Sequence, residues 1–295
     1  MSKADYLTSK NYRIEFMSDL NTSAYVTQVE AWRKQRETDL RAPDSWLSLA
    51  GLFVLQEGQN TIGSAPTNNI ILPEHAPAAL GSIEFWQGKA TLIVSTQTPV
   101  LVDGAPAQRA TLTDNGHRQK PTLVTVGSIT FFVHHFSDQY AIRVKDSANP
   151  AIQAFSGCVW FPVKPAYRVE GRFVRHAAPQ AIPIKTTVNT DTSYESVGVV
   201  TFELLGQPLQ FLAQDYGIPG QLAIVFRDAT SGKETYGAAR FLTVELREDG
   251  TAVVDFNKAY NPPCAFTPYA TCPLPPRENS LRVPIEAGER YAGAH

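Results

Sequence analysis

The stretch that decides the fold is "TAVVDFNKAYNPPCAFTPYATCPLPP", residues 251–276. Its start is rich in β-branched and apolar residues, which favours a β-strand. From Asn261 onward it contains six prolines, too many for a helix or a central strand. Because proline lowers the entropy that a loop loses when it is held in one conformation, the stretch predicts a final strand that runs into a rigid loop.

The residues before this loop, 167–256, predict the sheet to which the final strand belongs. Segments such as "SVGVVTFEL", "QLAIVFRD" and "AARFLTVEL" have strand composition, and turn-like segments such as "REDG" separate them. We therefore predict an antiparallel meander or half-barrel over residues 167–295, closed by the Pro/Cys-rich loop.

A second β-rich block lies upstream, at residues 46–146. Its short strands alternate with turn signals at Glu57-Gly58, Gln87-Gly88 and Asp103-Gly104, a spacing typical of a β-sandwich. Residues 147–166 then join the two blocks. This connector contains three prolines and the apolar run "CVWF", so we expect a linker that is packed between two domains rather than exposed.

Residues 1–45 predict an N-terminal helical segment. Residues 1–20 have no clear pattern, and Asn21, Thr22 and Ser23 can each cap a helix N-terminus. Apolar residues at helical spacing then predict a helix to Leu40, ended by Pro43, whose apolar stripe packs on a sheet. The predicted fold class is mainly β: an N-terminal helix, a β-sandwich and a C-terminal meander or half-barrel.

Composition excludes several classes of protein. The 295 residues are 43% hydrophobic and 18% charged, as expected for a globular chain. A net charge of −2 without a basic stripe argues against nucleic-acid binding. The chain has no apolar run long enough for a membrane helix and no signal-peptide pattern at its start, so we expect a cytoplasmic protein. The oligomeric state is not indicated.

Four short motifs follow one another within residues 46–146: Ile-Gly, then Asn-Asn-Ile, then Val-Asp-Gly, then a segment from Leu to Gly. This order resembles the forkhead-associated (FHA) family, which implies a β-sandwich fold. The matching positions are Ile62, Gly63, Asn68, Asn69, Ile70, Val102, Asp103, Gly104 and residues 123–127.

The phosphothreonine site of that family is not retained. Ser64 stands at the position of its phosphate-binding arginine, and Ala78, Ala79 and Gly81 stand where its loop serine and histidine belong. Because a phosphate dianion is bound by arginine and hydroxyl donors, we expect the fold of the family without its ligand.

The closing motif D-F-N-x-A-Y-N-P-P-C-A-F-x-P-Y-A-T-C-P-x-P, together with "FSGCVWFPVKPAYRVEGRFV" and "FRDATSGKETYGAARFLTVEL", closely resembles the family known as domain of unknown function 1684. The resemblance runs from about Tyr25 to Ala292. It implies kinship but carries no established activity, so a function has to be argued from the residues.

Polar residues gather around the loop at residues 255–269 and the segment at residues 227–240. If strand order brings them together, they offer guanidinium donors, carboxylates and phenols at the mouth of the half-barrel, which suits a small anionic ligand. The candidate ligand-binding residues are Arg227, Asp228, Tyr236, Arg240, Asp255, Asn257, Tyr260, Asn261 and Tyr269.

Three alternatives stay open. The same residues can act structurally, because Asn and Asp often bond to their own backbone and an Arg–Asp pair can tie two loops together. An enzyme would use Asp255 or Asp228 as general base, Tyr260 or Tyr269 as proton relay, and Arg240 on an oxyanion. A protein-interaction scaffold would use the N-terminal helix or the tryptophans Trp46 and Trp86.

Cys264 and Cys272 form a candidate thiol pair within the Pro-rich loop. Their spacing permits a disulfide, but it is not that of a zinc knuckle, and no histidine in the loop could activate a nucleophile. Two buried, inert thiols are the favoured interpretation. No catalytic, nucleotide-binding or metal motif is present, so neither a cofactor nor a metal is expected.

Overall fold

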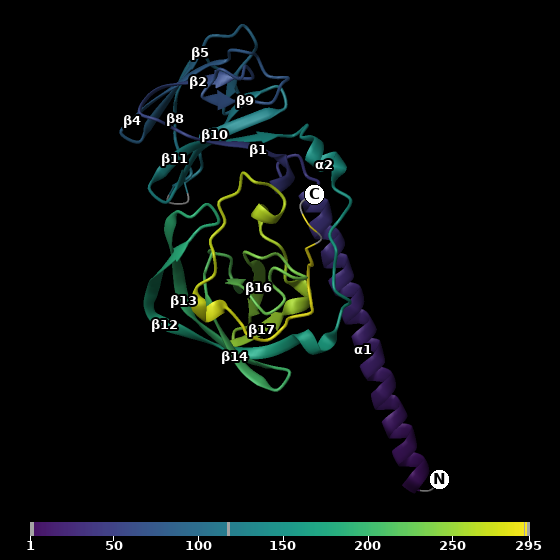
Figure 1. Cartoon of the computed structure of the whole chain (residues 1–295). Coiled ribbons are helices and arrows are strands. Elements are labelled where there is room, and N and C mark those ends of the chain that lie inside the picture. Colours follow the sequence, from purple (N-terminus) through teal and green to yellow (C-terminus); the bar gives the residue numbers. More distant parts are fainter. Residues whose placement is uncertain (1–2, 117–118, 292, 294–295) are drawn as a thin grey trace.

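The computed structural model describes residues 3–116, 119–291 and 293 (Figure 1). Within these residues the protein is mainly β. One long helix is followed by three sheets, in which a single pair of strands is parallel and no sheet closes into a barrel. The predicted mainly β class is therefore confirmed.

The N-terminal helix, α1, spans Lys3–Leu40, and its end agrees with the prediction. The predicted start at residues 21–23 is wrong. Those residues lie inside the helix, because no proline or glycine precedes them to interrupt it. Val29 is fully buried, and the helix contacts the short 3₁₀ segments η3 (Pro165–Tyr167) and η4 (Phe256–Lys258). Through Tyr25 it also reaches Asp255, the last residue of β17 (Thr251–Asp255).

The N-terminal β-domain consists of two packed sheets. The first has the order β1-β11-β10-β9-β6-β7 and the second the order β3-β2-β4-β5-β8. The strands are β1 (Leu49–Val54), β2 (Gly58–Gly63), β3 (Ile70–Ile71), β4 (Gly81–Trp86), β5 (Lys89–Val94), β6 (Leu101–Val102), β7 (Ala105–Pro106), β8 (Arg109–Leu112), β9 (Val124–Val126), β10 (Ile129–Phe136) and β11 (Gln139–Asp146).

Strand β11 shows how this sandwich presents its outer face to the rest of the protein. Ile142 and Val144 are fully buried in the core between the two sheets. Because successive side chains of a strand point to opposite faces, Arg143 and Lys145 lie on the outer face, where they border the C-terminal domain. The sandwich thus supplies two neighbouring cations to the junction between the domains.

The C-terminal domain is a six-stranded antiparallel sheet with the order β14-β13-β12-β17-β16-β15. Two meanders are joined where β12 pairs with β17. Two of the predicted strands merge into the long β12, in which the register shifts between Arg175 and Gln180. The strands are β12 (Arg168–Lys185), β13 (Asp191–Leu204), β14 (Gln207–Ala213), β15 (Gln221–Phe226), β16 (Arg240–Leu246) and β17 (Thr251–Asp255).

The edge strands β14 and β15 approach each other but pair at a single isolated bridge, between Gln214 and Ala223. Asn279 joins these strands further along. Its amide accepts from the Leu212 N–H at 2.8 Å and donates to the carbonyls of Leu212 at 3.0 Å and Val225 at 2.9 Å. One side chain from the C-terminal segment therefore satisfies backbone groups on both edges of the open sheet.

The connector between the domains is partly buried, although Val159 of its run "CVWF" is 42% exposed. It contains the short helix α2 (Pro150–Ala154). Phe155 and Phe161 are buried, and Trp160 makes an edge contact with Trp32 of α1 at 5.9 Å between ring centroids. The apolar residues of this segment therefore bind the helix to the C-terminal domain.

His134 on β10 gives the sandwich a dependence on pH. Its Nδ1 lies 3.0 Å from Asn115 Oδ1, an acceptor, which leaves Nε2 unprotonated. Nε2 is buried with no partner among the described residues, and burial lowers the pKa of His134 to about 3. In an unfolded chain the imidazole pKa is about 6.5. The folded-state pKa is lower than the unfolded-state pKa, so protonation of His134 favours the unfolded chain. The contribution of the neutral imidazole to the free energy of unfolding is therefore complete above pH 6.5 and is lost as the pH falls toward 3.

We predict that His134→Gln removes part of the loss of stability that acid causes. Between pH 7.5 and 5.5 the wild-type free energy of unfolding should fall by about 1 kcal/mol more than that of the variant. Urea unfolding at the two pH values measures this difference. Equal losses in both proteins would contradict the role of His134.

Candidate functional site

Arg240 and Asp228 form an ion pair in which neither side chain has exposed surface. Arg240 Nη2 donates to Asp228 Oδ2 at 2.7 Å. The same guanidinium donates to the carbonyls of Ile285, at 3.0 Å, and Ala287. Asp228 Oδ1 accepts from the N–H groups of Thr230, at 2.7 Å, and Ile285, at 3.2 Å. The pair holds the C-terminal segment against the sheet, and its guanidinium is not open to a ligand.

Asp255 and Asn257 bind the N-terminal helix and the connector. The Tyr25 hydroxyl donates to Asp255 Oδ1 at 2.8 Å, and Asn257 Nδ2 donates to the Tyr25 oxygen at 2.9 Å. Asn257 also accepts from the Lys164 N–H at 2.9 Å and donates to its carbonyl at 2.8 Å. Burial raises the pKa of the Tyr25 phenol far above its usual range, so this hydroxyl stays a donor. These polar groups fasten separate parts of the chain.

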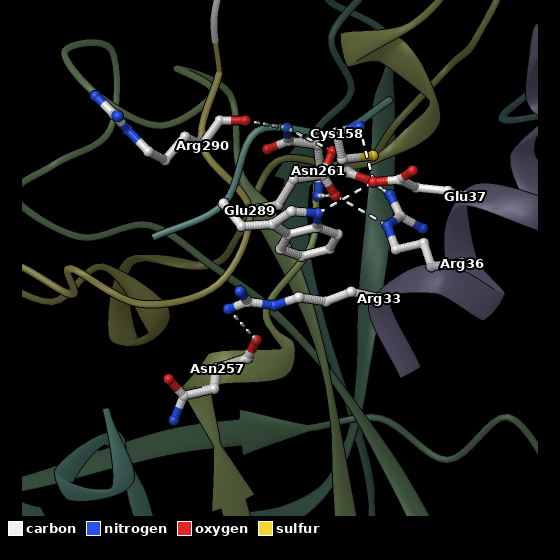
Figure 2. A network of polar contacts seen from close by, with 9 residues as sticks. Arg33, Arg36, Glu37, Cys158, Asn257, Asn261, Glu289 and Arg290 are labelled. Atoms are coloured by element: carbon white, nitrogen blue, oxygen red, sulfur yellow. Dashed lines mark hydrogen bonds and ion pairs between the residues drawn. The ribbon is translucent and has the colours of Figure 1, made fainter. Parts of the chain in front are cut away.

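Asn261 belongs to a second network at the same helix, shown in Figure 2. Arg36 Nε and the Asn261 N–H both donate to Glu289 Oε2, at 2.9 Å and 3.0 Å, and Asn261 Nδ2 donates to Glu289 Oε1 at 3.0 Å. Arg36 Nη2 also reaches the Asn261 carbonyl at 2.9 Å. The Glu289 side chain is 2% exposed, so this arginine compensates a buried carboxylate.

Glu37 and Glu289 were not among the residues predicted from the sequence. Glu37 Oε1 accepts from the Cys158 N–H at 3.1 Å and from Trp160 Nε1 at 3.3 Å. Arg33 stacks over the Trp160 ring at 4.8 Å. The available signal was weak: charged residues at helical spacing in α1, and an apolar connector that needs partners for its polar groups. Which carboxylate meets which donor is decided by the fold.

The four remaining predicted residues do not share one site. Arg227 is exposed, and Tyr269 is 36% exposed. Tyr236 is half-buried and donates to the Cys264 carbonyl at 3.0 Å. Tyr260 packs under the Arg36 guanidinium at 4.4 Å from its ring centroid. The structure therefore disperses the predicted cluster, and a ligand for these residues stays a prediction.

Cys264 and Cys272 lie against each other as free thiols. The Cys264 N–H donates to Cys272 Sγ at 3.3 Å. Within the described ranges no group of three or more His, Cys, Asp or Glu side chains is placed to hold a metal ion.

Two adjacent clefts lie where α1, the sandwich and the C-terminal domain meet. The Trp32 cleft, of about 470 Å³, is lined by Trp32, Gln35, Arg36, Asp39, Leu40, Asp44, Ser45, Trp46, Lys145, Thr243 and Tyr260. The Arg143 cleft, of about 370 Å³, shares Ser45, Trp46 and Lys145 with it. Its other lining residues are Leu49, Phe132, Arg143, Tyr216, Phe241, Pro263, Ala270, Thr271, Cys272 and Pro273.

The two clefts differ in charge. The Trp32 cleft contains two cationic and two acidic side chains. The described lining of the Arg143 cleft contains Arg143 and Lys145 but no carboxylate. Arg143 Nη2 reaches Thr271 Oγ1 at only 3.4 Å, and its Nε is buried with no partner within the described part of the chain. Lys145 Nζ donates to the Asp44 carbonyl at 2.7 Å.

Burial dominates the electrostatics of these two cations. It lowers the pKa of Arg143 to about 10 and also lowers the pKa of Lys145. Arg143 stays protonated at neutral pH, and its charge is partly removed from water with no carboxylate in the described lining of the cleft, whereas Lys145 has the Asp44 carboxylate nearby. The Arg143 cleft is therefore an electropositive, partly apolar cavity.

Comparison with known proteins concerns mainly the C-terminal domain. A family model described as "Protein of unknown function (DUF1684)" matches residues 153–290. An uncharacterized protein of Haloarcula marismortui, solved by NMR, is 33% identical over 47% of this chain and 78% of its own, with a TM-score of 0.40. The C-terminal half of the chain belongs to the DUF1684 family. The match starts at residue 153, well after the predicted start near residue 25.

Two solved FHA domains are similar to the N-terminal part of the chain. One comes from a study of phosphothreonine-dependent FHA interactions and the other is the FhaA FHA domain bound to an intracellular domain. Both are 22% identical with a TM-score of 0.22, and they cover 31% of this chain and 79% and 84% of their own. No curated protein matches. None of the described helices combines the length and apolarity needed to cross a membrane.

We predict that Arg240→Ala destabilises the DUF1684 domain by about 3–5 kcal/mol, because it leaves the Asp228 carboxylate buried without its partner. Arg227→Ala is the matched control, since Arg227 is exposed nearby, and it should change stability by less than about 0.5 kcal/mol. Chemical denaturation of the three proteins measures both effects. Similar values for the two variants would contradict the structural role of Arg240.

Proposed function

We propose that the protein binds a small organic anion in the Arg143 cleft. The observation that carries this proposal is the pair of cations on β11. Arg143 and Lys145 project from one face of the strand, because residues two apart share a face, and no carboxylate is present in the described lining of the cleft. A cavity that contains partly desolvated positive charge favours an anionic ligand.

The guanidinium of Arg143 has unused capacity to donate hydrogen bonds. Its Nε has no partner among the residues described, and its contact with Thr271 is long. A carboxylate or phosphate can accept two parallel bonds from a guanidinium, which fixes its orientation. Each charge-assisted bond contributes about 1.5–3 kcal/mol, so an anion gains more here than a neutral ligand.

The remaining walls favour a ligand with a flat apolar body. Trp46, Phe132 and Phe241 contribute aromatic surface, and Ser45 and Thr271 contribute hydroxyl groups. A cavity of about 370 Å³ lies within the range of about 300–1,000 Å³ that is usual for small-molecule sites. Both β-domains contribute to the walls, so a bound ligand would also stabilise their junction.

This proposal keeps the predicted class of ligand and moves its position. The predicted residues Asp228, Arg240, Asp255, Asn257 and Asn261 have structural partners and do not line the Arg143 cleft. The carboxylates that the enzyme hypothesis assigned as bases serve the fold: Asp228 is paired with Arg240, and Asp255 Oδ1 accepts from Tyr25, while Asp255 Oδ2 is buried and does not line either cleft. The scaffold hypothesis gains no support from Trp46, which lies in the cleft walls.

Calorimetric titration with benzoate, phenyl phosphate and the neutral analogue benzyl alcohol tests the proposal. We predict that at least one anion binds more tightly than benzyl alcohol. Arg143→Met should weaken its binding by about tenfold to a hundredfold, as expected for the loss of one charge-assisted interaction. Higher ionic strength should weaken the binding further.

The matched control is Arg227→Met, which removes an exposed arginine outside the cleft. It should leave the affinity unchanged. Equal affinity of the wild-type protein and Arg143→Met, or a stronger effect of Arg227→Met, would show that the Arg143 cleft is not the binding site.

A further inference from the structure

The Pro-rich loop holds two thiols next to each other in a fixed conformation. Cys264 and Cys272 are eight residues apart, yet the Cys264 N–H donates to Cys272 Sγ at 3.3 Å. Pro262 and Pro263 precede the first cysteine, and Pro273 follows the second. Because proline restricts the backbone, the loop keeps the two thiols adjacent rather than allowing them to separate.

Groups outside the loop fix the backbone of both cysteines. The Tyr236 hydroxyl donates to the Cys264 carbonyl at 3.0 Å. The Thr187 N–H donates to the Cys272 carbonyl at 2.8 Å, and the Cys272 N–H donates to Thr187 Oγ1 at 3.2 Å. The pair is therefore held from two sides by the C-terminal domain, which lowers the entropy cost of joining the two sulfurs.

The two thiols differ in their surroundings. Cys264 is partly exposed, whereas Cys272 is 4% exposed and lines the Arg143 cleft. The pKa of Cys264 is lowered because its thiolate accepts a hydrogen bond from Cys272, and the pKa of Cys272 is raised because it donates that bond. One thiol is thus accessible and more easily ionised, and its neighbour retains its proton.

We propose that Cys264 and Cys272 form a thiol–disulfide exchange site for low-molecular-weight disulfides, with Cys264 as the attacking thiol and Cys272 as the resolving thiol. The site differs from the inert pair favoured on the sequence, because the fold packs Cys264 against Cys272 and exposes the two residues unequally.

The exchange proceeds in two balanced steps. The Cys264 thiolate attacks one sulfur of the small disulfide, the S–S bond of the reagent breaks, and the first small thiol leaves with the proton that Cys264 lost. Cys272 then loses its proton and attacks the Cys264 sulfur, which releases the second small thiol. The protein dithiol is oxidised by two electrons to a disulfide, and the small disulfide is reduced to two thiols.

Cys158 provides an internal comparison. It lies in the connector beside α1, where its N–H donates to Glu37. Burial raises the pKa of the Cys158 thiol, and no second cysteine accompanies it among the contacts of the described chain. A reagent that only reports thiol content would not distinguish the three cysteines. The proposed site, in contrast, predicts that Cys264 reacts before Cys158 and Cys272.

Reaction of the fully reduced full-length protein with glutathione disulfide tests the proposal. After quenching and alkylation, intact mass should show the loss of two hydrogens, about 2 Da, and peptide mapping should join Cys264 to Cys272. Cys272→Ala should stop at a mixed disulfide on Cys264, because the resolving thiol is absent. Cys158→Ser should behave as the wild-type protein does.

A measurement on the unmodified sequence guards against variants that fail to fold. With limiting iodoacetamide, Cys264 of the native protein should be alkylated at least about tenfold faster than Cys158, since one pKa unit changes the thiolate fraction tenfold. Preferential reaction of Cys158 or Cys272, or a wild-type mixed disulfide that never resolves, would overturn the proposal. Iodoacetamide carries no charge, so the alkylation readout does not depend on an anionic ligand, and its failure is distinct from a failure of the Arg143 cleft to bind one.

Discussion

The buried ion pair between Arg240 and Asp228 is the interaction on which the arrangement of the C-terminal domain and the helix depends. Arg240 binds the carbonyls of Ile285 and Ala287, and these residues lead directly to Glu289. Glu289 in turn accepts from Arg36 of α1. The position of the helix is therefore linked, through a short series of polar contacts, to one guanidinium in the core of the sheet.

The shape of the sheet explains why such polar contacts are needed. Its edge strands β14 and β15 meet at one isolated bridge, so backbone groups beyond that bridge need other partners. Asn279 supplies them for Leu212 and Val225. The C-terminal segment thus completes the sheet, and buried polar residues that resemble a binding site in the sequence serve the fold instead. Desolvation makes each of them costly to leave unpaired.

The side chains that a ligand could contact lie instead in the cleft where the two β-domains meet. The outer face of β11 brings Arg143 and Lys145 to this junction, and the Pro-rich loop brings Cys272 to it from the other side. Neither domain alone encloses the Arg143 cleft. This arrangement gives the N-terminal sandwich a part in the candidate site through the outer face of its sheet, which carries Arg143 and Lys145.

Residues 251–276, the turn signals and the alternating strands determined a good part of this protein: the mainly β class, the end of the helix, the rigid loop and the kinship to DUF1684. These features are local, because proline, glycine and strand periodicity act on neighbouring residues. The start of α1 was missed because a cap residue inside a long helix looks the same as one at its end.

The tertiary structure alone decided which polar residue serves which purpose. From the sequence, Arg240 was predicted to bind an anion and Arg143 was not, yet Arg240 is closed into a pair with Asp228 and Arg143 borders a cleft whose described lining has no carboxylate. Partners so far apart in sequence are brought together by strand order and by the packing of the C-terminal segment on the open sheet. Burial and charge compensation, which decide whether a guanidinium is structural or available, exist only after those distant segments have packed together.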